Sequence, residues 1–384
     1  MIIFFIQMSA NKSSILLFPV VSLILGIFSA KLEISFFIIV ASTFIILTFL
    51  ITRFQILEKF LIIKAALSIL LFFVGYFALI QQRQRFSLFD SLTINKKFII
   101  IGNVESIQHS LNNKFPYCTI IKIEKIKEDS NKWLKLSNYI QIYSLEEPSI
   151  KTDDTILVKN VRLNNINNLD FKNYLMRINI NNSFFTKKIF FKILNRPNFS
   201  VKRNFENIKY KLINRIQSKM KNNAFCLFSS IFLGNKNLVK KDMQPTSYKF
   251  ANWGISHIIA RSGLHLWILI LVLQIIFSLF RSFIVRRILM IIIMIMFYII
   301  SWPAIPFTRS IITYILFEFC NIFGFTHNTI HLFLLTCIII LTSNPIQIFF
   351  LDFQLSFMIT YILLWYAQII HKNKKLLINS PKIS

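Results

Sequence analysis

Polar and charged side chains interrupt an apolar stretch of the chain near residues 254–265. His257, Arg261 and His265 follow one another at intervals of four residues, so on a helix they would share one broad face. An Arg and two His along one apolar segment are costly in lipid and usually face a water-filled path. We therefore expect these three side chains to line a polar path through a membrane.

Glycines gather around the same segment in a chain that has few of them. Three of the 7 glycines, Gly234, Gly254 and Gly263, fall within thirty residues. Such positions favour close approach of helices or a positive φ. Ser262-Gly263 stands at the head of an apolar run, where it is expected to kink or unwind a helix and free backbone groups to line a cavity.

Further polar residues interrupt the apolar segments downstream. Pro306 breaks a helix just before Arg309, a lone charge beside apolar runs. Glu318 lies in the middle of the next segment and is expected to pair with Arg309 or Arg261. Three more polar residues open the last apolar segment: Asp352, Gln354 and Ser356.

Uncharged apolar runs dominate the chain and exclude both a disordered protein and a soluble enzyme of one domain. Several are long enough to cross a hydrocarbon core of ~30 Å. The net charge of +28 comes from 44 Lys and Arg against only 16 Asp and Glu, as expected for a membrane protein with few acids. The expected spans are 13–30, 34–52, 65–82, 256–280, 288–302, 310–326, 329–343 and 348–370.

A water-exposed domain interrupts these apolar runs. The stretch 86–221 holds 11 of the 16 acids, and its apolar and polar residues alternate as in half-buried strands. Five strands and one short helix near 172–177 suit a small OB-like barrel. The expected strands are 98–104, 117–126, 134–143, 155–163 and 184–193.

A basic amphipathic helix is expected after the barrel, within residues 199–221. Its apolar residues recur every three or four positions and are surrounded by Lys and Arg. Such a helix either lies on the bilayer surface with its bases towards lipid phosphates or packs on the barrel. The sequence leaves both possibilities open.

The fold class expected is therefore a polytopic α-helical membrane protein of about eight spans with an inserted OB-like outer barrel. Basic short loops place both termini in the cytoplasm and residues 86–198 outside, provided that the uncharged segment 222–235 does not cross. The parts are three N-terminal transmembrane helices (1–85), the soluble barrel (86–198), the linking helix (199–221), a second transmembrane block (222–370) and a basic cytoplasmic tail (371–384).

Five short motifs follow one another along the apolar part of the chain: Leu233-Gly234, Gly254-Ile255-Ser256-His257, Ser262-Gly263-Leu264-His265, Pro306-Phe307-Thr308-Arg309-Ser310 and Asp352-Phe353-Gln354-Leu355-Ser356-Phe357. In order and spacing these motifs resemble the core of ComEC-type competence membrane proteins. Asp170-Phe171-Lys172-Asn173-Tyr174-Leu175 also resembles the end of that family's outer OB-like domain.

The resemblance implies a channel that passes single-stranded DNA across the bacterial cytoplasmic membrane in natural transformation. It implies that His257, Arg261, His265 and Arg309 meet phosphates, that Ser262-Gly263 lets the backbone approach the strand, and that Asp352, Gln354 and Ser356 line the path. Gly234, Gly254 and Pro306 are then structural. No cofactor, metal or catalytic residue is expected. The expected partners are single-stranded DNA and the lipid bilayer.

The outer domain would receive the DNA, because OB-like barrels commonly stack bases on aromatic side chains. Four aromatic residues are candidates for stacking, although each is weighed against an ordinary place in the barrel: Tyr117, Trp133, Tyr139 and Tyr143.

The sequence departs from the family pattern in two ways. Arg261 stands where relatives have a small apolar residue, and the chain stops soon after Ile370 whereas relatives continue through more spans. Many relatives also carry a C-terminal metallo-β-lactamase-like domain. The expectation is a truncated copy: half of a split protein, a subunit completed by self-association, or a degenerate product.

Two other classes of function remain as alternatives. His327 and His331, four residues apart, suit a shared metal in a small-ion or metal transporter, but they flank a short loop where solvation is the simpler expectation. Ser262 and His265 suggest an intramembrane enzyme, but three residues on one helix are too local for the usual nucleophile–base geometry.

Overall fold

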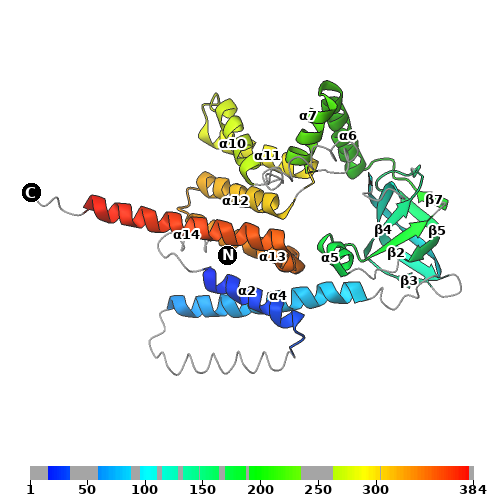
Figure 1. Cartoon of the computed structure of the whole chain (residues 1–384), viewed down its shortest axis with the longest axis horizontal. Coiled ribbons are helices and arrows are strands. Elements are labelled where there is room, and N and C mark those ends of the chain that lie inside the picture. The colour runs from blue at the N-terminus through cyan, green and yellow to red at the C-terminus, as the bar shows by residue number, and fades with distance from the viewer. Residues whose placement is uncertain are drawn as a thin grey trace, which may run out of the picture. The chain divides into compact units, whose positions relative to one another are not determined.

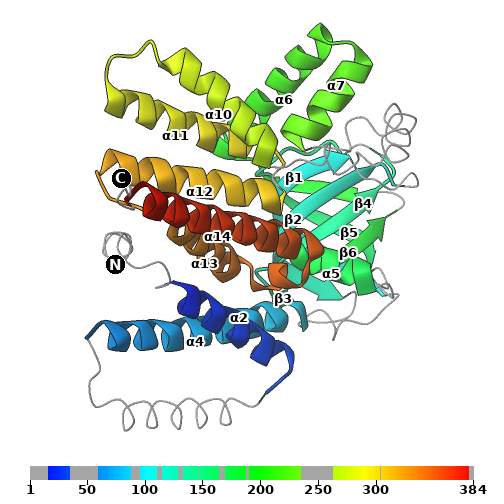
Figure 2. The same cartoon turned by 60° about the vertical axis from the view of Figure 1, so that its left-hand side comes forward.

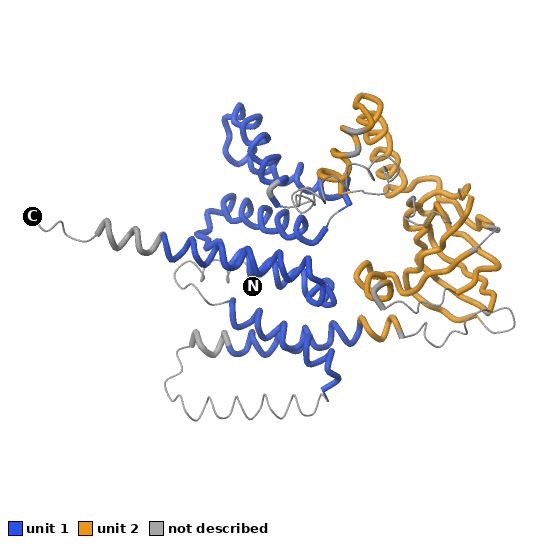
Figure 3. Tube along the Cα trace, in the orientation of Figure 1, with its two compact units in different colours: residues 1–81, 261–384 blue, residues 82–260 orange. Residues whose placement is uncertain are grey.

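Two units of different construction make up the chain: residues 1–81 with 261–384, and residues 82–260 (Figure 3). The structure is a computed structural model. It describes residues 16–34, 59–87, 96–109, 115–128, 133–146, 148–163, 169–186, 190–234, 263–302 and 304–379.

Runs of Leu, Ile and Phe form the helices of the first unit (Figure 1). Side-chain caps fix two of their starts, because Ser282 accepts a hydrogen bond from the Val285 amide and Asn328 accepts one from Ile330. The helices are α2 (Leu17–Lys31), α4 (Lys59–Ser87), α10 (Gly263–Phe277), α11 (Phe283–Ile300), α12 (Ile305–Ile322), α13 (Thr329–Ser343) and α14 (Leu351–Asn379), with a 3₁₀ turn, η4 (Pro345–Phe349).

Apolar clusters hold the described helices of this unit together, and two of them are large. The larger gathers side chains from α2, α4, α13, η4 and α14, and the smaller joins α10, α11 and α12. Figure 2 shows α12, α13 and α14 side by side, and α2 beside α4. The outward faces remain apolar, with Ile276, Ile295 and Leu363 exposed, as suits contact with hydrocarbon.

Three described helices are long and apolar enough to cross a membrane: Ala65–Phe86, Phe283–Ile300 and Leu351–Ile370. Shorter apolar helices occupy Leu17–Lys31, His265–Phe277 and Thr329–Ser343. Each of the five segments predicted downstream of the barrel overlaps with one helix, α10 to α14, although residues 256–262 of the first lie outside the described residues. The predicted span 34–52 lies outside the described residues.

A closed five-stranded barrel forms the second unit. The circuit runs β1 (Lys97–His109), β2 (Tyr117–Glu128), β4 (Tyr139–Ser144), β6 (Asn182–Thr186), β5 (Thr155–Leu163) and back to β1. All its pairings are antiparallel except that between β4 and β6. Alternate residues such as Ile121, Ile140 and Val158 are fully buried inside it, as the predicted two-residue period requires.

Short elements complete the barrel and correct two of the predicted strands. The predicted strand 184–193 is two strands, β6 and β7 (Phe190–Asn195), and 134–143 is β3 (Leu134–Lys135) followed by β4. β7 pairs with β5 and β3 with β2. Helix α5 (Leu169–Arg177) contains the predicted short helix.

The linking helix α6 (Val201–Lys219) packs on the barrel. Its own residues Lys209 and Ile213 are buried, and its Tyr210 hydroxyl donates to the Ile107 carbonyl of β1 at 3.1 Å. Its other face leaves Ile208 and Leu212 exposed. Packing on the barrel is thus observed, and contact of the outer face with lipid stays a prediction.

The uncharged segment after α6 forms one short helix, α7 (Asn222–Phe228), continued by the π-helical turn η2 (Ser229–Leu233). Gly234 closes that turn with φ of 76°, a left-handed conformation that glycine adopts at little cost. This is the structural role expected of Gly234.

Candidate functional site

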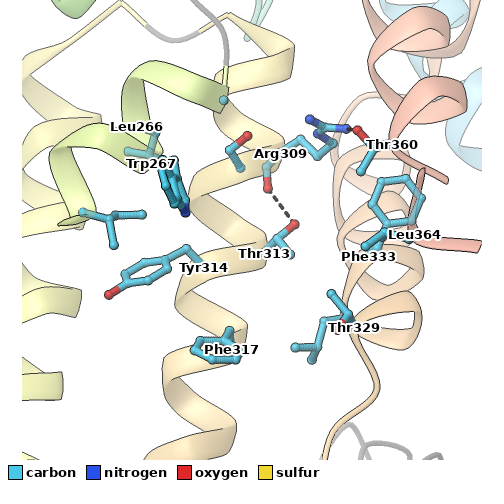
Figure 4. A pocket seen from close by; sticks show the side chains of 14 residues that line it. Leu266, Trp267, Arg309, Thr313, Tyr314, Phe317, Thr329, Phe333, Thr360 and Leu364 are labelled. Carbon is cyan, nitrogen blue, oxygen red and sulfur yellow. Dashed lines mark hydrogen bonds between the residues drawn. The ribbon is translucent and has the colours of Figure 1, made fainter. Parts of the chain in front are cut away.

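A cavity of about 560 Å³ lies among α10, α12, α13 and α14 of the helical unit (Figure 4). Its size falls within the range of about 300–1,000 Å³ typical of small-molecule sites. Arg309 and Thr360 lie at one end of the view, and Phe317 and Thr329 at the other. The cavity is therefore polar at one end and aromatic along its length.

Arg309 supplies the cation of the cavity. It follows the first turn of α12, and its Nη1 donates to the Ser356 carbonyl and the Thr360 hydroxyl of α14. Its guanidinium also lies 5.7 Å from the ring centroid of Phe357 and 6.0 Å from that of Phe333, close enough for a cation–π interaction. Within the described parts of the chain, no carboxylate forms an ion pair with it.

Hydroxyl groups continue the polar wall along α12. Ser310 donates to the Pro306 carbonyl at 3.0 Å, and Thr313 donates to the Arg309 carbonyl at 2.8 Å. The Thr313 hydroxyl also lies 3.0 Å from that of Thr336 on α13. The Thr313–Thr336 contact links α12 to α13 beside the cavity.

Gly263 allows α10 to approach α12 at this point. A Cβ at this position would lie 2.6 Å from the Ser310 hydroxyl oxygen and 3.9 Å from Nη2 of Arg309. A larger residue would therefore displace the polar wall. The close approach that the glycine pattern predicted is confirmed here.

An ion pair between α11 and α12 corrects one prediction. Glu318 is buried and pairs with Arg287 at 2.5 Å, and not with Arg309. Arg287 lies more than a turn inside α11, where its guanidinium also stacks 3.9 Å from the Phe283 ring centroid. Arg287 therefore lies in the helix and not in the loop before it, and the helical register brings it to the carboxylate.

The remaining predicted path residues are placed as follows. His265 lies half-buried on α10, and Asp352 lies half-buried in the first turn of α14. Gln354 is exposed and donates to the Ile348 carbonyl at 2.9 Å. Ser356 does not line the cavity, but its carbonyl accepts a hydrogen bond from Arg309, which does. His257, Arg261, Ser262 and Gly254 lie outside the described residues.

The two candidate metal-ligating histidines differ in their surroundings. His327 contacts the Phe325 carbonyl at 3.3 Å and meets the Phe317 ring edge-on, whereas His331 is buried on α13, so its predicted solvation is wrong. No group of three His, Cys, Asp or Glu side chains able to hold a metal occurs among the described residues.

Aromatic residues of the barrel form one stacked group. Tyr143 stacks on Phe185 with centroids 5.2 Å apart, and Phe115 lies 5.0 Å from the same ring. Trp133 is 42% exposed and Tyr139 lies 6.0 Å from the Lys122 ammonium, while Tyr117 is half-buried in β2. Tyr139 and Tyr143 are four residues apart on β4 and therefore share one face of that strand.

Asp154 is the most buried charge of the barrel. Burial alone would raise its pKa, but hydrogen bonds from Arg196 and the Lys151 amide and the charges of Arg196 and Arg203 outweigh that effect, so its pKa lies below the ordinary value. Arg196 and Arg203 contact it at 2.6 and 2.8 Å. This cluster fixes the start of α6 to the barrel.

Residues 231–384 match the family model described as Competence protein. This stretch is similar to that family, and we call it the competence domain. It includes the cavity and all five helices α10 to α14. No curated protein and no solved structure matches the chain. Together with the apolar helices, the competence domain indicates a membrane protein that handles DNA and supports a role in DNA uptake during competence.

Several cavity residues of the competence domain were not singled out in the sequence. Thr313 and Phe317 follow Arg309 at four-residue steps, Trp267 follows Gly263, and Thr360 follows Ser356. The helical period alone places each beneath its motif residue. Residues four and eight positions after each motif residue lie on the same helix face, so these cavity residues could have been predicted from the motifs.

Proposed function

We propose that the chain is a channel component that passes single-stranded DNA across the bacterial cytoplasmic membrane during natural transformation. The observation that carries the proposal is the cavity of the competence domain, in which Arg309 has no carboxylate partner among the described residues. Arg309 is half-buried among apolar helices, and a cation without a counter-ion is costly there unless an anion visits it. The phosphate of a passing strand supplies that anion.

Arg287 provides a comparison for Arg309 within the same bundle. Arg287 and Arg309 lie on adjacent helices, yet Arg287 is neutralised by Glu318 while Arg309 faces the cavity. A merely structural arginine in a bundle would be expected to resemble Arg287. The channel contributes position and charge and performs no covalent chemistry.

The proposed topology has about eight spans, both termini in the cytoplasm and residues 86–198 outside. Three described helices have the length and composition of a span. We assign further spans to the shorter apolar helices, where neighbouring helices separate the ends of these helices from the lipid. A second polypeptide or another copy of the chain would complete the channel wall.

The barrel is proposed as the domain that receives DNA. Its strand order and its parallel β4–β6 pair support an OB-like architecture. The stacked rings of Phe115, Tyr143 and Phe185 offer aromatic surface of the kind that single-strand binders use.

A small-ion or metal transporter is the alternative function. It would use His327 and His331, but only His331 is buried, and no three-ligand group joins them among the described residues. The unpaired cation at the cavity favours an anionic substrate instead.

Uptake of labelled DNA tests the proposal. Cells lacking the chain should still bind DNA at the surface but should accumulate no labelled strand in the cytoplasm, and restoring the chain should restore accumulation. Unchanged cytoplasmic label after removal of the chain would rule the function out.

A further inference from the structure

The cavity of the competence domain combines two chemistries that a nucleic-acid strand also combines. The guanidinium of Arg309 and the hydroxyls of Ser310 and Thr313 form its polar part. The rings of Trp267, Tyr314 and Phe317 line its wall (Figure 4). We propose that this cavity holds one nucleotide unit of the passing strand, with its phosphate at Arg309 and its base against the Trp267 ring. The proposal rests on the proposed function and names the residues that make the contact.

The nitrogens of the Arg309 guanidinium have different surroundings. Nη1 is held by the Ser356 carbonyl and the Thr360 hydroxyl, which fix the side chain against α14. No described residue accepts a hydrogen bond from its Nε or Nη2, and Nη2 lies 3.9 Å from the place that a Cβ on Gly263 would occupy. A fixed guanidinium with free donors suits a phosphate oxygen, since charge-assisted hydrogen bonds are strongest where the donor is already oriented.

The rings lie within reach of that phosphate site. Trp267 follows Gly263 by one helical turn, and Gly263 lies beside Arg309. Tyr314 and Phe317 lie five and eight residues after Arg309 on α12, a rise of roughly 8 and 12 Å along the axis. Phe317 is further fixed by edge contact with the His327 ring at 4.9 Å.

Stacking on an aromatic ring tolerates every base, because each base has a π-face. A path that must pass any sequence needs contacts of this kind and not hydrogen bonds to base edges. The rings therefore explain how the cavity could grip a strand without selecting its sequence. A phospholipid headgroup shares the phosphate but has no use for the rings, so a nucleotide unit fits the whole lining better.

The test uses the full chain in nanodiscs of zwitterionic lipid and two fluorescent probes, a 12-residue oligothymidylate and the same backbone with abasic sites. Trp267→Leu should weaken binding of oligothymidylate by about tenfold and leave the abasic probe unchanged. Trp267→Phe should restore most of the affinity. Trp365→Leu is the matched control, since Trp365 is 54% exposed against 58% for Trp267 but lies outside the cavity lining.

Arg309→Gln should weaken both probes and lower the slope of log affinity against log salt by about 0.7, the share of one phosphate on a single strand. A merely structural role for Arg309 would leave that slope unchanged. Equal loss of both probes in Trp267→Leu, or no loss of either, overturns the proposal. Anionic phospholipid that displaces the oligonucleotide from the native chain but not from Arg309→Gln would assign the cavity to a headgroup instead.

Failure here is distinct from failure of the proposed function. Unchanged oligonucleotide affinity in Trp267→Leu, combined with loss of uptake in cells lacking the chain, rejects the nucleotide cavity and keeps the channel. Uptake that persists without the chain rejects both.

Discussion

Arg287 and Arg309 show how neighbouring residues of one type take different roles. Each guanidinium lies in the apolar bundle, but Arg287 meets Glu318 at 2.5 Å and Arg309 meets a carbonyl and a hydroxyl. The sequence identified Arg309 as a lone charge, yet it could not reveal the partner of Glu318. That choice depends on the rotation of α11 about its own axis, which no local pattern in an almost uniformly apolar helix specifies.

Removing one partner of the ion pair should destabilise the bundle. Glu318→Leu leaves the Arg287 charge buried without compensation and should cost about 3 kcal/mol, seen as a lower midpoint of thermal unfolding in detergent. The double variant Arg287→Leu/Glu318→Leu should recover most of that loss, because no charge remains buried. A double variant as unstable as the single one would contradict the pairing.

The buried carboxylate of Asp154 should make the barrel sensitive to acid. Because its folded pKa lies below the ordinary value, its stabilisation is complete above the unfolded pKa of about 3.9 and is lost as the pH falls through the folded pKa. Asp154→Asn should cost about 3 kcal/mol at neutral pH and flatten the acid dependence, measured by hydrogen exchange of the β5 amides.

Glu105→Gln provides the matched control for that measurement. Glu105 also ties the barrel to α6, through Lys202, but this pair is partly exposed. Its loss should cost no more than about 1 kcal/mol. Equal effects of the two substitutions would show that burial does not govern these contacts.

At the scale of elements, hydropathy located the helices well and the strand ends poorly. The run from Phe184 to Ile193 was predicted as one strand because no glycine or proline divides it, whereas β6 pairs with β4 and β5, and β7 pairs with a different part of β5. Closure of the barrel requires that division. A closed circuit of pairings is a property of the whole sheet and is absent from any single run.

The crossing of α2 and α4 depends on small residues at their contact. A Cβ at Gly26 would overlap the Phe72 carbonyl, and a Cβ at Gly75 would meet that of Leu23. Gly26→Leu should therefore force the helices apart and lower the unfolding midpoint clearly. Leu25→Ala on the exposed side of α2 should change the unfolding midpoint little. A larger effect of Leu25→Ala than of Gly26→Leu would contradict close packing of α2 on α4.

In the molecule as a whole, the distribution of acidic and apolar residues along the sequence distinguishes the two units. Acids concentrate in the barrel, whereas in the apolar helices of the other unit Arg287 is paired with Glu318 and Arg309 lines the cavity. The sequence predicted this division and the motifs at the cavity. It could not predict which motif residues meet, since Arg309 contacts Ser356 across 47 positions while Asp352 and Gln354 of the same motif do not line the cavity.

The proposed topology is open to a labelling test in intact cells. In a Cys226→Ala background, Lys159→Cys on the barrel should react with an impermeant maleimide from outside. Arg281→Cys, in the loop before α11, should react only after permeabilisation, while Cys118, Cys320 and Cys337 are buried and burial raises the pKa of the Cys118 thiol to about 12. Labelling of both new cysteines from the same side would contradict the topology.

Cytoplasmic accumulation of labelled DNA in Arg309→Gln cells tests whether the strand passes through the cavity. With the variant present in the membrane at the native amount, accumulation should fall at least about tenfold, because the cavity loses its charged contact with the strand. Arg286→Gln, which removes a guanidinium outside the cavity, should leave accumulation unchanged. Native accumulation in Arg309→Gln would contradict a strand that passes through this cavity.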